Sequence, residues 1–426
     1  MHIKEFGRVR DSELDVLPFV LFSGESGLGK SYMALLCHYF YEVFIDYTRL
    51  TNFFKQRNYD YSEMSKDFHN EGVAFTVQKD ELEKWLAEDV VSYVGEMLAN
   101  SSFVGSIMVN LPANIPDKLT FHFKEELTGL VNDEDVDIVL SLHHLSYRVS
   151  DSILSDVSPF SFLLCNELKT YIWGDFRRLY KTFVLPPSRG PVLTETLLPQ
   201  SGVYVKFNQM LSELNRLPNK GNDISSTFFE LFHRLIEGET LRTNNRYIYR
   251  TPKVEIPISA AAASIREIAP LEMLAKKVDV RTSSILLEEP EAHLHPLKQR
   301  LMADLLSAFV NAGCFMQVTT HSDYLLRRLN ELIMLDELRS QTNDKDYDMF
   351  CKEIETLPDL SLGTERIAAY KMECREDGFS RIVRQNLIPE VGIPYSSFSE
   401  AIMKSLDTLS KLEKKIELQR ESDHVE

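Results

Sequence analysis

Eight consecutive residues fit the pattern G-x-x-x-x-G-K-[ST] of a phosphate-binding loop. They are Gly24, Glu25, Ser26, Gly27, Leu28, Gly29, Lys30 and Ser31. An apolar stretch, 19–22, precedes them and a helix-like segment, 32–44, follows, which is the strand–loop–helix context that the pattern requires. Glycines let backbone N–H groups converge on phosphate oxygens, and the helix adds the positive end of its dipole. The lysine would reach the β- and γ-phosphates and the serine would hold Mg²⁺. A glycine-rich turn that binds nothing is the alternative.

Two adjacent carboxylates, Glu288 and Glu289, follow the apolar run 284–287 and could take part in catalysis. Such a run is typical of a buried parallel strand, and ligands of open α/β sheets bind outside the carboxyl ends of strands. Adjacent side chains of a strand point to opposite faces, so the two glutamates should differ in role. The first could hold the Mg²⁺ shell and the second could orient or deprotonate an attacking water. A solvated acidic strand end is the alternative.

A third candidate is His321, which follows the strand-like run 314–318 one helix further along the chain. At the end of that strand its ring nitrogen could donate a hydrogen bond to the γ-phosphate. Alone, a histidine at such a position is more often structural. The two preceding motifs, in this order, favour the functional interpretation.

The phosphate loop, the run L-L-E-E-P-E-A-H-L-H-P and the run T-T-H-S together resemble the ABC/SMC-like ATPases, and more narrowly the heads of the overcoming-lysogenization-defect (OLD) type. The short run Leu185–Gly190 is also similar to an element of that family. The resemblance implies an α/β fold, an ABC-type P-loop head whose mixed sheet is flanked by helices, with an inserted α-rich lobe. It also implies ATP and Mg²⁺ as ligands. The implied roles are Lys30 and Ser31 for Walker A, Glu288 for Walker B, Glu289 for the catalytic glutamate and His321 for the switch histidine.

In this family two heads sandwich two ATP molecules, and a signature helix of each head completes the other's site. The matching segment here is 258–267, where Ala262 and Ala263 stand in place of serines and Ser264 in place of glycine. Ser264 is the remaining candidate for contact with the partner's nucleotide. We expect it to cap its helix together with Glu267, as a capping box. The altered signature predicts slow hydrolysis.

The length of 426 residues indicates more than one unit. We expect residues 1–50 and 182–340 to form the ATPase head, 51–181 an inserted, mostly helical lobe that could add strands to the head, and 341–426 a C-terminal helical extension. Apolar residues recur at helical spacing in that extension, and we expect them to pack on the head rather than on another chain. They are Ile402, Leu406, Leu409, Leu412 and Ile416. The region after residue 332 lacks the β/α series of a nuclease domain.

The composition of the chain limits the classes of molecule that it is expected to bind. A net charge of −17 does not indicate nucleic acid, although a local basic patch could still bind it. No apolar run approaches the length of a membrane span, and the N-terminus lacks a signal-peptide pattern. Five scattered cysteines with no C-x-x-C pair favour buried, reduced thiols. The chain is therefore expected to be cytoplasmic, with no membrane partner.

The favoured hypothesis is an ATP-binding and ATP-hydrolysing switch whose heads form a homodimer or a higher homo-oligomer. Since the chain carries no effector of its own, the resemblance implies a separate nuclease or toxin, as in anti-phage defence. The alternative of the same class is a DNA-repair or chromosome-maintenance ATPase, which the charge and the absence of sustained heptads disfavour. A transporter subunit and a small-molecule kinase fit the later motifs less well.

Overall fold

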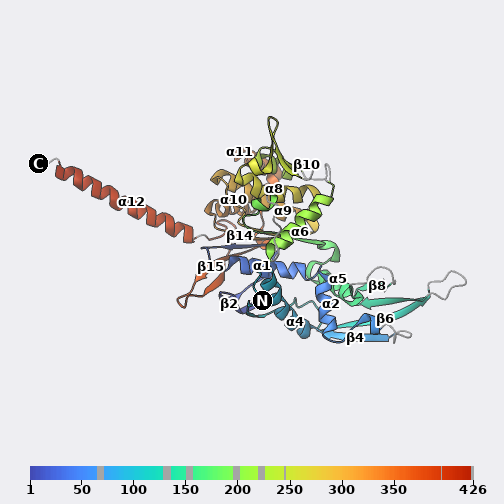
Figure 1. The fold of residues 1–426 in the computed structure, drawn as a ribbon. Coiled ribbons are helices and arrows are strands. Elements are labelled where there is room, and N and C mark those ends of the chain that lie inside the picture. Colours follow the sequence, from blue (N-terminus) through green and yellow to red (C-terminus); the bar gives the residue numbers. More distant parts are fainter. Residues whose placement is uncertain are drawn as a thin grey trace.

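The computed structural model describes residues 1–64, 72–127, 136–149, 157–194, 202–218, 226–243, 246–394 and 396–423. Its centre is a mixed sheet in the order β5-β1-β2-β16-β15-β3-β14-β13-β9 (Figure 1). The nine strands are β1 (His2–Phe6), β2 (Val9–Glu13), β3 (Phe19–Ser23), β5 (Gly105–Met108), β9 (Lys181–Leu185), β13 (Ser283–Glu288), β14 (Phe315–Thr320), β15 (Ile367–Cys374) and β16 (Ser380–Arg384).

Five neighbouring strands, β9, β13, β14, β3 and β15, run parallel. The others close the opposite side of the sheet with antiparallel pairs β1–β2, β1–β5 and β15–β16. In the parallel part Ser23 is level with Thr320, and Thr319 with Glu288. The carboxyl ends of β3, β13 and β14 therefore meet at one edge. The expected fold class, an α/β head with a mixed sheet flanked by helices, is confirmed.

Alternating side chains of the central strands feed two hydrophobic cores, one on each face. Phe19 and Leu21 of β3 belong to one core, and Val20 and Phe22 to the other. The second core is covered by α1 (Lys30–Glu42) and α4 (Lys79–Met97). The helices over the first core are α6 (Val203–Arg216), α7 (Ser226–Ile236), α8 (Ala263–Lys277), α9 (Pro296–Ala312) and α10 (Asp323–Gln341). A small sheet beside them contains β10 (Glu239–Thr243), β11 (Arg246–Arg250) and β12 (Glu255–Pro257).

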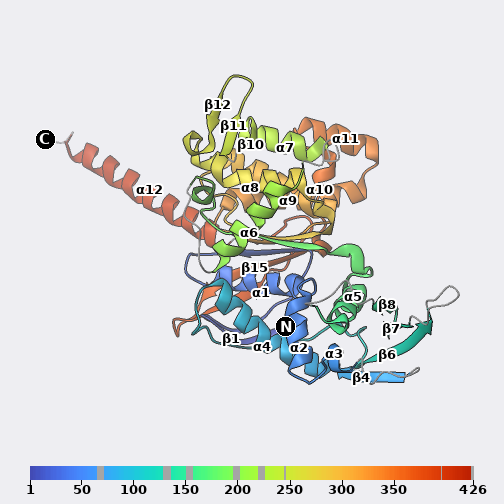
Figure 2. The ribbon, with the colours of Figure 1, turned by 45° about the vertical axis from the view of Figure 1, so that its right-hand side comes forward.

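The inserted segment holds both helices and a sheet of its own, which extends to one side of the head (Figure 2). Its helices besides α4 are α2 (Tyr47–Lys55), α3 (Tyr61–Met64) and α5 (Pro159–Trp173). An antiparallel sheet in the order β4-β6-β7-β8 lies beside them, formed by β4 (Gly72–Gln78), β6 (Lys118–Leu127), β7 (Val136–Leu142) and β8 (Leu145–Val149). Rings of Phe54, Phe75, Phe121 and Phe160 join helices and sheet. The segment also gives β5 to the main sheet.

The C-terminal part is not only helical. After α11 (Asp344–Glu353) the chain returns to the main sheet as β15 and β16. This differs from the expected helical extension after residue 340. The physical reason is that β15 is buried on both faces beside β3, so its run Ile-Ala-Ala-Tyr lacks the polar alternation that marks an exposed strand.

The last helix, α12 (Ser396–Asp423), projects away from the head (Figures 1 and 2). All side chains described in it, 402–416, are exposed. Its apolar stripe does not pack on the head of its own chain, and that expectation was wrong. Hydrophobic spacing along a helix reports a face that needs a partner, and it does not report where the partner lies.

Two expectations from composition can be compared with the structure. The five cysteines are free, and four are buried, but Cys374 is exposed. Among the described residues no helix combines the length and the apolar character needed to cross a membrane.

Candidate functional site

The phosphate loop connects β3 to α1 at the carboxyl edge of the sheet. Its three glycines have positive φ angles of 126° at Gly24, 75° at Gly27 and 99° at Gly29, which side chains rarely adopt. A Cβ on Gly24 would also lie 2.9 Å from the carbonyl oxygen of Met372 in β15. The sequence therefore folds here into a tight loop that ends at the N-terminus of α1, the end of a helix that favours anions.

Lys30 lies under this loop. Its Nζ donates hydrogen bonds to the carbonyl oxygens of Gly24 (3.0 Å) and Glu25 (2.8 Å) and lies 3.4 Å from Nδ1 of His321. Burial lowers the pKa of Lys30 to about 8, and nearby carboxylates, Glu289 foremost, oppose the shift. A phosphate beside this ammonium group would stabilise its charged form. Glu25 itself is exposed.

Ser31 and Glu288 contact each other across the site. The Ser31 hydroxyl donates to Oε2 of Glu288. Glu288 is 4% exposed, and burial raises the pKa of its carboxyl. A hydroxyl and a carboxylate oxygen side by side are donors that suit Mg²⁺, which usually completes its shell with water and substrate phosphates. The described residues hold no cluster of three or more His, Cys, Asp or Glu side chains that could hold a metal ion.

Glu289 begins the turn after β13. Its φ is +46°, a left-handed conformation that costs free energy in a residue with a Cβ. The Glu289 N–H donates to the carbonyl oxygen of Thr319 (3.0 Å) and approaches its Oγ1 (3.3 Å). The side chain is 42% exposed, in contrast to that of Glu288. The two carboxylates thus differ in environment, as the strand pattern predicted.

His321 lies between the lysine and this glutamate. Its Nε2 is 3.6 Å from Oε1 of Glu289 and 3.4 Å from Oγ of Ser26. Burial, with the nearby Lys30 charge, lowers the pKa of His321 below its ordinary value, which favours the neutral ring. Since an ammonium group only donates, its contact with Nδ1 places the proton on Nε2, toward Glu289 and the loop. His321 is thereby positioned as a hydrogen-bond donor.

Glu291 holds the backbone of His321 in place. Its Oε1 accepts hydrogen bonds from Oγ1 of Thr320 (2.8 Å) and from the N–H of His321 (2.6 Å). Burial raises the pKa of this carboxyl. Its other oxygen is buried without a hydrogen-bond partner among the described residues. The E-E-P-E spacing is the signal by which the sequence could have assigned it this structural role.

Arg189 is a further residue at the site, one to which sequence reasoning gave no role. It is 1% exposed and follows β9. Its guanidinium donates to the carbonyl oxygens of Pro186 (3.0 Å), Glu267 (2.7 Å) and Glu288 (2.8 Å). The Glu267 carboxylate in turn accepts from the N–H groups of Arg189 (2.9 Å) and Gly190 (3.0 Å). Arg189 therefore joins β9, the first turns of α8 and the peptide just before Glu289.

These contacts overturn one expectation about the signature helix. The N-cap of α8 is Ala262, which offers no side-chain cap, and Ser264 lies inside the first turn. The capping box between Ser264 and Glu267 does not form, because Glu267 is engaged by the turn at Arg189. Within the described residues no hydrogen bond links Ser264 to the cluster around Lys30. The structure thus brings together all the predicted loop, glutamate and histidine residues, but not Ser264.

Comparison with known proteins adds a family-level finding. Residues 115–326, which are 212 of the 426 residues, match the family model described as an AAA ATPase domain. The match includes Glu288, Glu289 and His321, while the phosphate loop precedes it. Together with the loop geometry, it supports a P-loop ATPase of the AAA class. The comparison with curated proteins found no match.

Among solved structures, the chain is similar to the SMC head domain from Thermotoga maritima, at 13% identity and a TM-score of 0.32, with 91% of this chain and 98% of that one covered. It is also similar to an Smc head domain with an extended coiled coil, bound to the C-terminal domain of ScpA, from Pyrococcus furiosus, at 12% identity and a TM-score of 0.36, with 96% and 99% covered. Scores this low mark a distant likeness only.

Proposed function

We propose that this chain is an ATP-driven switch, and that a pair of its heads closes around ATP and opens after hydrolysis. The observation that carries the proposal is the cluster at the carboxyl edge of β3, β13 and β14. There a buried carboxylate is bonded to the loop serine, the loop lysine lies 3.4 Å from the ring of His321, and that ring lies 3.6 Å from the exposed carboxylate of Glu289. This is the set of groups that phosphoryl transfer to water needs.

The side chains have distinct roles in the proposed reaction. Lys30 neutralises the β- and γ-phosphate oxygens, and Ser31 and Glu288 hold the Mg²⁺ ion, which when bound offsets the phosphate charge. Glu289 accepts a proton from the attacking water, for which its exposure and its neighbour His321 suit it. His321 donates from Nε2 to a phosphate oxygen. Water adds to the γ-phosphorus as the bond to the β–γ bridging oxygen breaks, giving ADP and phosphate.

We infer that heads pair because the site of a single head does not include Ser264. Ser264, the candidate for contact with the γ-phosphate, lies outside the cluster of its own chain. A second head could supply it. The proposed consequence is a homodimer or higher homo-oligomer in the cytoplasm that holds or releases a separate effector, a nuclease or toxin, in anti-phage defence. The effector and the defence role rest on the resemblance of the motifs to OLD-type heads.

The experiment is the solution mass of a Glu289→Gln variant with and without Mg-ATP. The same chain carries Leu409→Glu, so that the exposed stripe of α12 does not itself join copies. We expect the mass of one chain without nucleotide and twice that mass with Mg-ATP, since the variant binds ATP and does not release it by hydrolysis. A matched chain with Lys30→Ala in addition should stay at the mass of one chain. A nucleotide-independent mass would contradict the pairing of heads.

A further inference from the structure

α12 presents an exposed apolar face that packs against no other part of the chain among the residues that the structure describes. Five apolar side chains recur every three or four residues and so lie on one face of the helix. Their exposed fractions lie between 43% and 55%. They are Ile402, Leu406, Leu409, Leu412 and Ile416. Exposed stripes of this kind mark interaction sites rather than ordinary surface.

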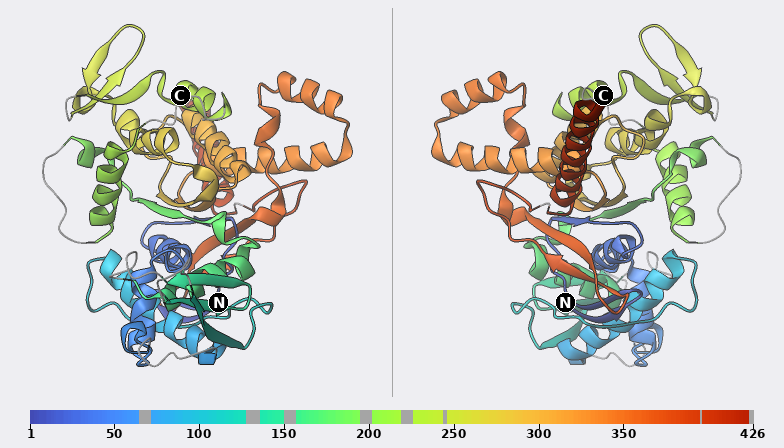
Figure 3. Two further views of the ribbon diagram at one scale, coloured as in Figure 1. Left: turned by 90° about the vertical axis from the view of Figure 1, so that its right-hand side faces the viewer. Right: turned by 90° about the vertical axis from the view of Figure 1, so that its left-hand side faces the viewer.

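The second surface is a groove between α10 and α11, which stand out from the head in Figure 3. A cavity of about 550 Å³ opens there. Its apolar lining residues are Met334, Leu335, Leu338, Phe350 and Ile354. Three of them are well exposed, Met334 at 47%, Ile354 at 41% and Phe350 at 38%. We refer to this surface as the α10–α11 groove.

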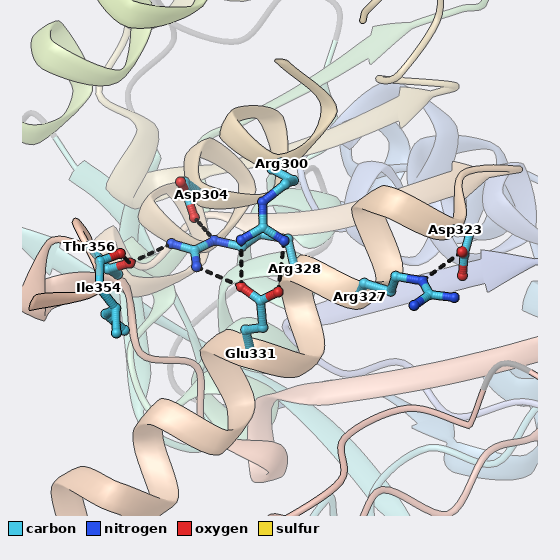
Figure 4. A network of polar contacts seen from close by, with 8 residues as sticks. All are labelled: Arg300, Asp304, Asp323, Arg327, Arg328, Glu331, Ile354 and Thr356. Atoms are coloured by element: carbon cyan, nitrogen blue, oxygen red, sulfur yellow. Dashed lines mark hydrogen bonds and ion pairs between the residues drawn. The ribbon is translucent and has the colours of Figure 1, made fainter. Parts of the chain in front are cut away.

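A polar network makes the wall of the α10–α11 groove rigid (Figure 4). Arg328 of α10 donates to Asp304 (2.7 Å), Glu331 (2.8 Å) and Thr356 (2.8 Å), and Glu331 is also held by both terminal nitrogens of Arg300 (2.7 Å each). Thr356 donates to the carbonyl oxygen of Ile354, which lines the cavity. The network therefore ties α9, α10 and the end of α11 together. A preformed groove binds at a lower ordering cost than a surface that must first be shaped.

The charges of the two surfaces are complementary. The arginines that line the cavity are already bonded to carboxylates, which leaves Glu337 and Glu390 at its rim. The segment of α12 that carries the stripe, 402–416, has four lysines against Asp407 and Glu413, whereas the whole helix, 396–423, has five basic and six acidic residues, so the complementarity is confined to the stripe. Opposite charge at the rim guides an amphipathic helix into an apolar groove and fixes its orientation.

The connection to α12 places the two surfaces at neighbouring points of one chain. The N–H of Ile393 donates to Asn330 of α10 (2.7 Å), and the amide of Asn330 donates back to the Ile393 carbonyl (2.9 Å). Glu390, just before this anchor, lines the cavity. From the anchor α12 leads away from its own head (Figure 1), and the apolar side chains of its stripe are exposed.

We propose that α12 of one copy docks in the α10–α11 groove of a second copy, and that the exchange is reciprocal. An exchange of identical elements gives a closed twofold dimer in which both apolar surfaces of both chains are buried. This contact does not involve nucleotide. It would keep two heads together while their ATP sites are open, and it does not depend on the proposed switch.

The test uses two full-length variants without nucleotide. Leu409→Glu places a charge in the stripe, and Met334→Glu places one in the groove, both at exposed positions that the fold does not need. We expect the unaltered chain to have twice the mass of one chain and each variant alone to have the mass of one chain. An equimolar mixture of the two variants should regain the double mass, because the intact helix of the groove variant meets the intact groove of the stripe variant.

Matched controls are Thr408→Glu, which lies on the same helix outside the stripe, and Met349→Glu, which is exposed on α11 but does not line the cavity. Both should keep the double mass. Circular dichroism checks that each variant is folded. A mixture that stays at single mass would overturn the proposal, and a groove variant that keeps the double mass while the stripe variant loses it would indicate pairing between two α12 helices instead. An unaltered chain at single mass, or variants that keep the double mass, would also overturn it.

Discussion

Replacing Arg189 with lysine separates the positioning of Glu289 from the binding of ATP. The planar guanidinium serves three carbonyl oxygens at once, those of Pro186, Glu267 and Glu288. A lysine keeps the charge but offers a single nitrogen, which does not span these acceptors. The peptide between Glu288 and the left-handed Glu289 then loses the support on one side. Alanine would be a less useful change, because three buried acceptors at about 1–3 kcal/mol each approach the stability of a domain.

We expect Arg189→Lys to lower the turnover number and not the affinity for ATP. A shift of the catalytic group by about 1 Å costs about 10²-fold in rate. We therefore expect Arg189→Lys to lower kcat for ATP hydrolysis by about 10- to 10²-fold, with the Kd for ATP unchanged, because Arg189 does not touch the phosphate loop. The control is Arg177→Lys, which alters an exposed arginine paired with Asp175. The reasoning is refuted if the folded variant keeps its kcat, or if its Kd for ATP rises as much as its kcat falls.

Two further predictions concern Lys30. Lys30→Ala should abolish ATP binding, measured by calorimetry, because it removes the cation that meets the phosphates, and an unchanged affinity would remove the phosphate loop from the account. In the unaltered chain burial holds the pKa of Lys30 at about 8, and a bound polyphosphate should raise it. ATP binding at pH 8 should then take up about half a proton, and affinity should fall as pH rises above 8. Calorimetry in two buffers of different ionisation enthalpy measures this uptake, and heats that do not depend on the buffer would contradict it.

The sequence predicted the central part of the site because its local patterns coincide with the chemistry. The glycines at 24, 27 and 29 need positive φ angles, and the apolar runs before Glu289 and His321 are central parallel strands. All three motifs end at the carboxyl edge of the parallel strands, where the ligands of such sheets bind.

Other features depend on contacts between residues that are distant in sequence, so the local sequence pattern indicates them only weakly. Arg189 acts through carbonyl oxygens, whose direction no residue type reveals. β15 lies beside β3, and β16 lies between β15 and β2. The bonded residues Ser23 and Tyr370 are 347 positions apart in sequence, and at such separations propensity gives way to tertiary context. The capping box at Ser264 was expected from spacing, but Glu267 is bonded to a turn near residue 190. The stripe on α12 was recognised, whereas its exposure depends on where the chain leaves the head.

The central claim is that Glu289 activates water in the proposed ATP site, and hydrolysis by the unaltered chain and two matched variants tests it most directly. Single-turnover hydrolysis and ATP affinity would be measured for the unaltered chain, Glu289→Gln and Glu291→Gln. The account predicts that Glu289→Gln binds ATP as before and loses about 10²- to 10⁴-fold in rate. Glu291→Gln, which keeps an oxygen to accept from the His321 N–H, should lose less. Normal hydrolysis by Glu289→Gln would contradict the account and move the catalytic role to another group.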